Sequence, residues 1–155
     1  MCATLSIRMA LMGTDKTCPC GSERSFANCC EPTIQGAAAE TPEALMRSRY
    51  SAYVLGYWNY LRESWHPKTR PSRVSPTDTD WLGLTIVKTT ANSVEFIAGF
   101  REGSKVMLLH ETSRFELVDG HWCYLDGRCD ITEAGRNSSC PCGSGVKTKR
   151  CCGKG

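Results

Sequence analysis

The sequence lacks any long hydrophobic run. Among its 155 residues, no apolar stretch reaches the roughly 18 to 20 residues that a membrane-spanning helix requires, so no membrane span is predicted. Residues 1–13 are largely apolar, but they match a signal peptide poorly. Arg8 interrupts the apolar stretch, no basic region precedes it, and no clear cleavage site follows it. We therefore expect a soluble protein.

An excess of one charge is also absent. The chain has 19 lysines and arginines against 16 aspartates and glutamates, for a formal net charge of +3. Proteins that bind nucleic acid along a broad face are usually far more basic, so that class is not indicated. Positive charge is concentrated only near the C-terminus, where no acidic residue follows Glu133 and where the cations include Lys147, Lys149, Arg150 and Lys154.

Cysteine, in contrast, is abundant, with 11 residues. Eight of them form two copies of one pattern, in which Cys-Pro-Cys-Gly-Ser is followed, after eight residues counted from the second cysteine, by an adjacent Cys pair. The first copy contains Cys18, Cys20, Cys29 and Cys30, and the second contains Cys140, Cys142, Cys151 and Cys152. Two identical modules therefore lie on either side of the central sequence.

Four cysteines at this spacing can close a tetrahedral thiolate site of the kind that structural zinc occupies. Disulfides are the alternative, but cysteines that are adjacent or one residue apart are poorly placed to bridge each other. We therefore predict two zinc sites, with iron as the other metal that thiolates suit. Cysteines intended for metal binding indicate a reducing compartment, so we expect the cytoplasm.

The sequence after the first module predicts two helices. Thr41 is a good N-cap, Pro42 suits the first helical position, and Glu43 favours the positive end of the helix dipole. This helix should end near Gly56, and a second should end near His66, before a proline. The expected apolar stripe of the first helix comprises Met46, Tyr50, Tyr53, Val54 and Tyr57.

Alternating apolar and polar residues then predict four strands, at about residues 81–87, 94–101, 105–117 and 121–126. Residues 32–40, 68–80 and 127–139 are expected to be linkers or loops. This order predicts an α+β fold in which helices lie against one face of a curved antiparallel sheet. We expect this central unit to bury its own apolar faces without help from the cysteine modules.

Both cysteine modules match the pattern C-x-C-x(8)-C-C and resemble the SEC-C motif, a small zinc-binding module also found at the C-terminus of the translocase ATPase SecA. The chain from Cys18 onward resembles the YchJ family of small bacterial proteins in the segments Arg47-Ser48-Arg49-Tyr50, Trp65-His66-Pro67, Trp81-Leu82-Gly83-Leu84, Ser113-Arg114-Phe115 and Trp122–Gly127. This resemblance implies an NTF2-like cone over residues 41–127, between SEC-C motifs at 18–31 and 137–155. Residues 1–17 have no counterpart and are expected to be an unstructured extension.

The resemblance implies one function for the modules. In SecA the motif is implicated in contacts with the chaperone SecB and the ribosome, which makes this chain a candidate docking adaptor for a ribosome or protein partner. The C-terminal module, with Lys147, Lys149, Arg150 and Lys154, is the expected docking surface. The alternatives are that these cations only offset thiolate charge, and that the modules only secure the chain ends. A dimer is compatible with the sequence.

The second function is an enzyme or small-ligand binder that uses a pocket in the central domain, as NTF2-like cones often do. The candidate pocket residues are His66, His110, Glu111 and Asp126. Glu111 is unusual because it lies on an apolar strand face, where a carboxylate must be paired or protonated. A structural ion pair with Arg47 or Arg49 is the preferred explanation.

Overall fold

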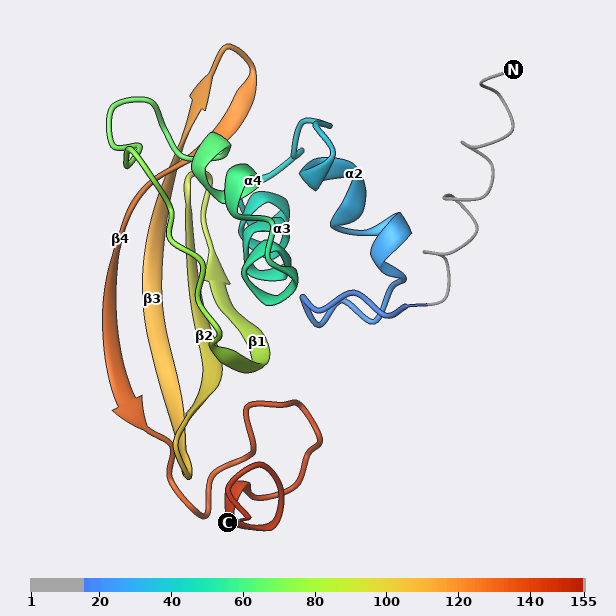
Figure 1. The fold of residues 1–155 in the computed structure, drawn as a ribbon, viewed down its shortest axis with the longest axis vertical. Coiled ribbons are helices and arrows are strands. Elements are labelled where there is room, and N and C mark those ends of the chain that lie inside the picture. Colours follow the sequence, from blue (N-terminus) through green and yellow to red (C-terminus); the bar gives the residue numbers. More distant parts are fainter. Residues whose placement is uncertain (1–15, 155) are drawn as a thin grey trace.

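The computed structural model describes residues 16–154 and contains one four-stranded antiparallel sheet with helices on one face (Figure 1). The strands β1 (Asp80–Thr89), β2 (Ser93–Glu102), β3 (Lys105–Val118) and β4 (His121–Glu133) neighbour one another in chain order. The helices are α2 (Glu31–Ile34), α3 (Pro42–Leu55) and α4 (Trp58–Glu63), with short 3-10 turns η1 (Phe26–Asn28) and η2 (Thr148–Arg150) in the cysteine modules. The predicted α+β fold is confirmed.

Membrane spans were not expected, and none of the helices within residues 16–154 is long and apolar enough to cross a bilayer. Residues 1–17 were expected to be an unstructured extension, and positions 1–15 of that segment lie outside the described residues. Lys16 and Thr17 belong to the first cysteine module: Thr17 forms a β-bridge with Ser25, and the Lys16 carbonyl accepts a hydrogen bond from Phe26 N at 2.8 Å.

Helix α3 begins and ends where its capping residues predict. Thr41 Oγ1 accepts a hydrogen bond from Ala44 N at 3.1 Å, which satisfies one of the free amides of the first turn. At the other end Gly56 adopts a left-handed conformation with φ of 84°, and its amide donates to the Ala52 carbonyl. Glycine adopts this conformation at little cost, so the helix stops there.

The expected apolar stripe of α3 is only partly correct. Met46 and Tyr50 are buried, but Val54 and Tyr57 are 39% and 42% exposed. The polar residues Ser48 and Ser51 are instead fully buried. The reason is that α3 packs against α4 and the first cysteine module as well as against the sheet. Ser48 Oγ lies 2.6 Å from the Tyr60 hydroxyl of α4, and Ser51 Oγ lies 3.5 Å from Cys18 Sγ of the first module.

Strand β4 extends beyond its predicted end, so the expected linker at residues 127–139 is wrong over its first half. Residues 127–133 pair in register with β3, from Gly127 opposite Ser113 to Glu133 opposite Met107. All seven of these residues are exposed. Backbone hydrogen bonds rather than burial hold this end of the strand, and a search for alternating apolar residues does not detect such a strand.

The C-terminal module packs against the strands β1 and β2. Pro141 lies so close to Gly83 and Gly99 that a Cβ at Gly83 would overlap the Pro141 carbonyl, and a Cβ at Gly99 would overlap the proline ring. Arg101 NH1 donates to the Cys152 carbonyl at 2.7 Å, which adds a second attachment. The module is therefore fixed to one end of the sheet, below β1 and β2 in Figure 1.

This packing predicts that a second substitution, at Pro141, restores stability in one of two glycine variants and not in the other. Gly99→Ala and Gly83→Ala should each lower the free energy of unfolding in urea by about 1–3 kcal/mol, the usual cost of overpacking. Adding Pro141→Gly should restore most of the loss for Gly99→Ala, because the ring atoms that the new methyl meets are removed. It should not restore Gly83→Ala, which meets backbone. Equal recovery in both double variants would contradict this packing.

Candidate metal centres

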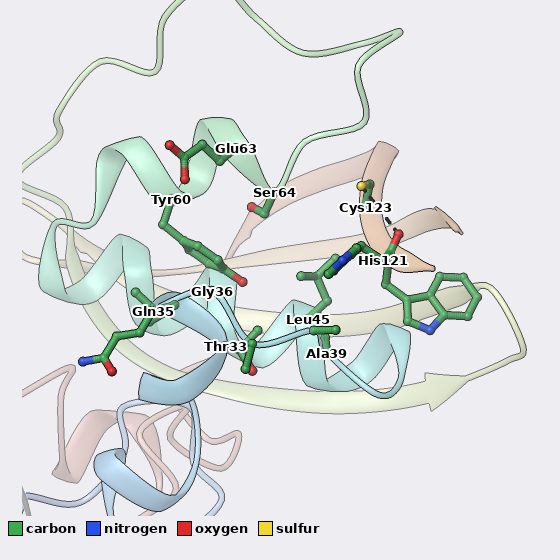
Figure 2. Close-up of a pocket in the computed structure, with 14 residues that line it drawn as sticks. Thr33, Gln35, Gly36, Ala39, Leu45, Tyr60, Glu63, Ser64, His121 and Cys123 are labelled. Carbon is green, nitrogen blue, oxygen red and sulfur yellow. Dashed lines mark hydrogen bonds between the residues drawn. The ribbon is translucent and has the colours of Figure 1, made fainter. Parts of the chain in front are cut away.

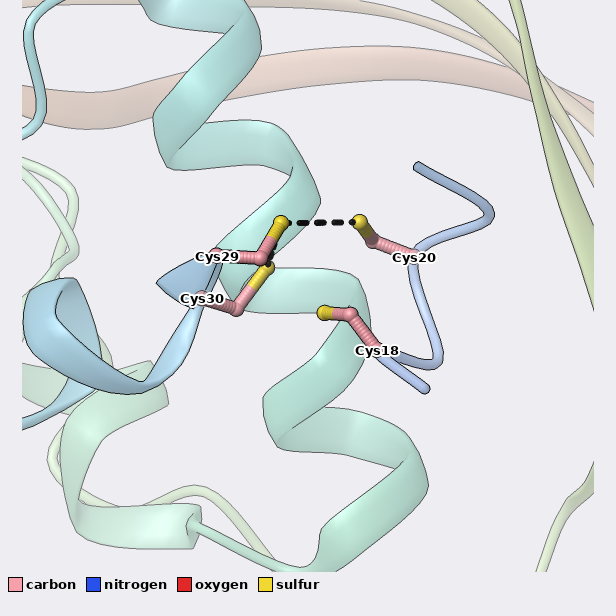
Figure 3. Close-up of side chains that lie close together, drawn as sticks. All are labelled: Cys18, Cys20, Cys29 and Cys30. Carbon is pink, nitrogen blue, oxygen red and sulfur yellow. Dashed lines mark hydrogen bonds between the residues drawn. The ribbon is translucent and has the colours of Figure 1, made fainter. Parts of the chain in front are cut away.

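The four cysteines of the first module converge at one point (Figure 3). Their Sγ atoms all lie within 4.8 Å of one another, with Cys20 and Cys29 3.6 Å apart. A tight turn brings the first two cysteines round: Gly21 has φ of 81°, and Cys18 N donates to the Arg24 carbonyl at 2.8 Å. η1 and the start of α2 supply the adjacent pair.

Electrostatics at this cluster favour a cation. A hydrogen bond with Cys18 lowers the pKa of the Cys20 thiol strongly, whereas a hydrogen bond with the same residue raises the pKa of Cys30. The thiols of Cys18, Cys20 and Cys30 thus compete for negative charge when only protons are shared among them. A metal ion binds all four as thiolates and removes this competition. Four clustered sulfur donors therefore fit a metal ion.

The second module repeats this geometry with Cys140, Cys142, Cys151 and Cys152, whose sulfurs also lie within 4.8 Å of one another. Ser144 Oγ lies 3.3 Å from Cys151 Sγ, as Ser22 Oγ lies 3.1 Å from Cys29 Sγ in the first. A hydrogen bond with Ser144 lowers the pKa of Cys142 to about 6, and burial raises that of Cys152 to about 12. This cluster fits a metal ion by the same argument.

The surroundings of the two clusters differ. Cys18, Cys20 and Cys30 are at most 3% exposed and belong to the same hydrophobic cluster as Tyr50 and Phe96. Arg47 of α3 donates to the Cys20 carbonyl at 2.8 Å. Of the four cysteines in the second module, only Cys140 is buried. The first module is thus part of the protein core, and the expectation that the central unit buries its own faces unaided is wrong for α3.

The four candidate pocket residues do not meet in one site. His66 is buried, accepts a hydrogen bond at Nδ1 from Lys68 N, and has Nε2 3.8 Å from Glu116. His110 lies on the solvent side of the sheet, 50% exposed and 2.8 Å from a Glu95 oxygen. Asp126 is half-exposed and paired with Arg114, whose guanidinium holds its pKa below the usual value.

Glu111 is the one candidate of the four that lines a cavity against α3, and its expected ion pair with an arginine is absent within residues 16–154. Arg47 pairs with Glu43 on its own helix at 3.0 Å. Arg49 is buried and donates to the Leu61 carbonyl and to Ser64 Oγ. Two hydroxyl groups instead donate to one oxygen of Glu111, Oε1, an arrangement that strand periodicity alone could not reveal.

A further groove lies between the segment after α2, the helix α4 and the start of β4 (Figure 2). It contains Cys123 and His121, a pair of residue types that can form a nucleophilic site. Here the Cys123 thiol donates to the His121 backbone carbonyl, not to the imidazole, and burial raises its pKa. An inert thiol of this kind gives no sign of catalysis.

Equivalent cysteine substitutions in the two modules should have unequal effects. Cys20→Ser should lower the free energy of unfolding of the central domain by about 3 kcal/mol or more, because it disrupts a cluster inside the core. Cys142→Ser, at the matching position, should leave the core folded. Urea unfolding followed by the fluorescence of the aromatic cluster around Trp81 measures this difference. Equal losses of unfolding free energy in the two variants would show that both modules contribute equally to the stability of the core.

Comparisons with known proteins agree with this architecture. A family model described as "YchJ, middle NTF2-like domain" matches residues 41–127, and the SEC-C motif matches residues 16–32 and 136–154. A UPF0225 protein of Photorhabdus laumondii is 45% identical over 155 aligned residues, covering 88% of this chain and 98% of the relative. Another, from Serratia proteamaculans, is 43% identical over 152 residues, covering 88% of this chain and 97% of the relative. No solved structure matches the chain. The chain therefore belongs to the YchJ family of UPF0225 proteins, with an SEC-C motif on each side of its NTF2-like domain.

Proposed function

We propose that each cysteine cluster binds one zinc ion, held by Cys18, Cys20, Cys29 and Cys30 in the first module and by Cys140, Cys142, Cys151 and Cys152 in the second. Four sulfur donors with no open position are typical of structural zinc, which needs no water or substrate ligand. In the first module the metal stabilises the core around α3. In the second it shapes a module that remains at the surface.

The zinc proposal predicts two equivalents per chain by elemental analysis of protein purified under reducing conditions. Substituting Cys123 or Cys129 by alanine should leave that number unchanged, since neither belongs to a thiol cluster. A mild chelator should remove zinc from the second module first, because three of its cysteines are partly exposed. Less than one equivalent of metal per chain would refute the proposal. Two equivalents of iron per chain would show that both sites bind iron instead of zinc.

We infer that the protein acts as a docking adaptor and that the C-terminal module contacts an acidic partner, with ribosomal RNA as the favoured one. The main support is that this module combines an exposed basic surface with a fixed backbone. Lys147, Arg150 and Lys154 are exposed, and Lys149 is half-buried. Arg150 N donates to the Lys147 carbonyl at 2.9 Å, and Cys140 N donates to the Val146 carbonyl at 2.9 Å. The backbone that bears these cations is therefore ordered by hydrogen bonds.

The arrangement of titratable side chains gives less support to an enzyme. General acid–base chemistry needs groups within hydrogen-bonding reach of a common substrate atom. His66, His110 and Asp126 each have a partner in a different part of the fold. A surface that binds through charge requires only that its cations stay accessible and ordered, and the second module meets that requirement.

Docking of this kind is salt-sensitive, because each cation that meets a phosphate releases a counterion. Replacing Lys147, Lys149 and Arg150 together by serine should leave two zinc ions bound and abolish co-sedimentation with ribosomes at low salt. The matched control replaces Lys68, Arg73 and Lys88, which are exposed elsewhere, and should sediment like the unchanged protein. Equal binding by both triple variants, or no binding by the unchanged protein, would reject docking through this surface. Loss of zinc in the first variant would instead assign the cations to balancing thiolate charge.

A further inference from the structure

An apolar cavity of about 250 Å³ lies between α3 and the sheet, and none of the clustered cysteines lines it. Met46, Tyr50 and Tyr53 of α3 form one wall, and Trp81, Phe96 and Glu111 of the first three strands lie among the residues opposite. The volume corresponds to about eight waters at liquid density, or a molecule of roughly ten non-hydrogen atoms. Glu111 is the one residue with a carboxylate in this lining.

The Glu111 side chain is held in place on one oxygen. Its Oε1 accepts hydrogen bonds from Ser113 Oγ at 2.7 Å and from the Tyr124 hydroxyl at 3.2 Å. Gly127 of β4 makes room for this arrangement, since a Cβ there would overlap Oε1 and crowd the tyrosine hydroxyl. Within residues 16–154 no hydrogen bond or ion pair reaches Oε2. One oxygen thus orients the carboxylate and the other is left to accept.

A buried arginine, Arg49, lies near these groups but forms no ion pair with the Glu111 carboxylate. The Arg49 guanidinium stacks 4.4 Å from the centre of the Tyr124 ring and 4.9 Å from that of Trp65. Its hydrogen bonds go to Leu61 and Ser64 rather than to Glu111. Burial raises the pKa of Tyr124, which therefore stays protonated as a donor to Glu111.

One side chain of the aromatic wall, Trp81, has a polar atom without a hydrogen-bond partner in the described part of the chain. Trp81 packs edge-on to Tyr50 at 5.9 Å and lies 6.2 Å from Tyr53. Its indole Nε1 is buried and has no hydrogen-bond partner among the described residues. Because this nitrogen has almost no accessible surface, it lies behind the ring and does not face the cavity. The lining of the cavity thus supplies one acceptor, on Glu111, beside an aromatic wall.

From the oriented carboxylate and the aromatic wall we propose that the cavity binds a small organic amine with an apolar body. The ammonium donates to Glu111 Oε2, and the rings of Tyr50, Tyr53 and Trp81 attract its positive charge. A charge-assisted bond to a carboxylate is stronger than a neutral one. Anions are disfavoured by the same carboxylate and ring faces. This site is separate from the docking surface and does not depend on docking.

The test uses the intact zinc-loaded protein and three probes of nearly equal size. Tyramine carries the ammonium, 4-(2-hydroxyethyl)phenol is its neutral analogue, and 4-hydroxyphenylacetate is the anionic one. Tyramine should shift the indole N–H resonance of Trp81 with a Kd of about 1 mM or lower, and the neutral analogue should bind about tenfold more weakly. The acid should not bind. Absence of any tyramine-dependent shift, or equal binding of amine and acid, would overturn the proposal.

Variants separate binding in the cavity from binding elsewhere. Glu111→Gln keeps a side chain of the same shape and should weaken tyramine binding by about tenfold or more. Glu95→Gln removes the same charge from the solvent side of the sheet, where Glu95 pairs with His110, and should leave binding unchanged. Ala98→Leu should occupy part of the cavity and weaken binding without altering charge. Unchanged affinity in Glu111→Gln, or equal loss in both glutamate variants, would contradict the site.

Discussion

The contact between the first cysteine cluster and α3 is the constraint on which the rest of the structure depends. One side of this helix faces the sheet through Met46 and Tyr50, and another carries Ser51 against Cys18 and Arg47 against the Cys20 carbonyl. A single 14-residue helix therefore links the cluster to the sheet. A metal ion that closes the cluster would also fix the helix, and would thereby couple folding of the central domain to metal binding.

The two modules have the same sequence pattern and different physical surroundings. The first lies under α3, where its sulfurs join the hydrophobic core. The second is attached to the sheet through Pro141 and Arg101, and three of its cysteines are partly exposed. Burial removes three of the four cysteines of the first module from the surface. The second module is attached to the sheet without being enclosed by it, so Lys147, Arg150 and Lys154 stay exposed.

The interior between α3 and the sheet is less apolar than a purely structural core would require. Arg49, Glu111 and Tyr124 bring a cation, a carboxylate and a hydroxyl into one region, and their bonds are distributed so that Arg49 and Glu111 do not pair. The hydrogen bonds of Arg49 to Leu61 and Ser64, and of Tyr124 to Glu111 Oε1, restrict how α3, α4 and β4 can pack. The same restriction keeps Glu111 oriented beside the cavity.

The sequence by itself determined the two thiol clusters, the α+β order, both ends of α3 and the turns between the strands, because spacing, capping and alternation are local signals. It could not determine the end of β4, since residues 127–133 are held by backbone pairing and bury no side chain. Nor could it find partners for Glu111 or show that His66, His110 and Asp126 lie apart, because pairing across strands depends on register and curvature. The different burial of two identical motifs was likewise decided only by tertiary packing, which sets one against a helix and the other against the end of a sheet.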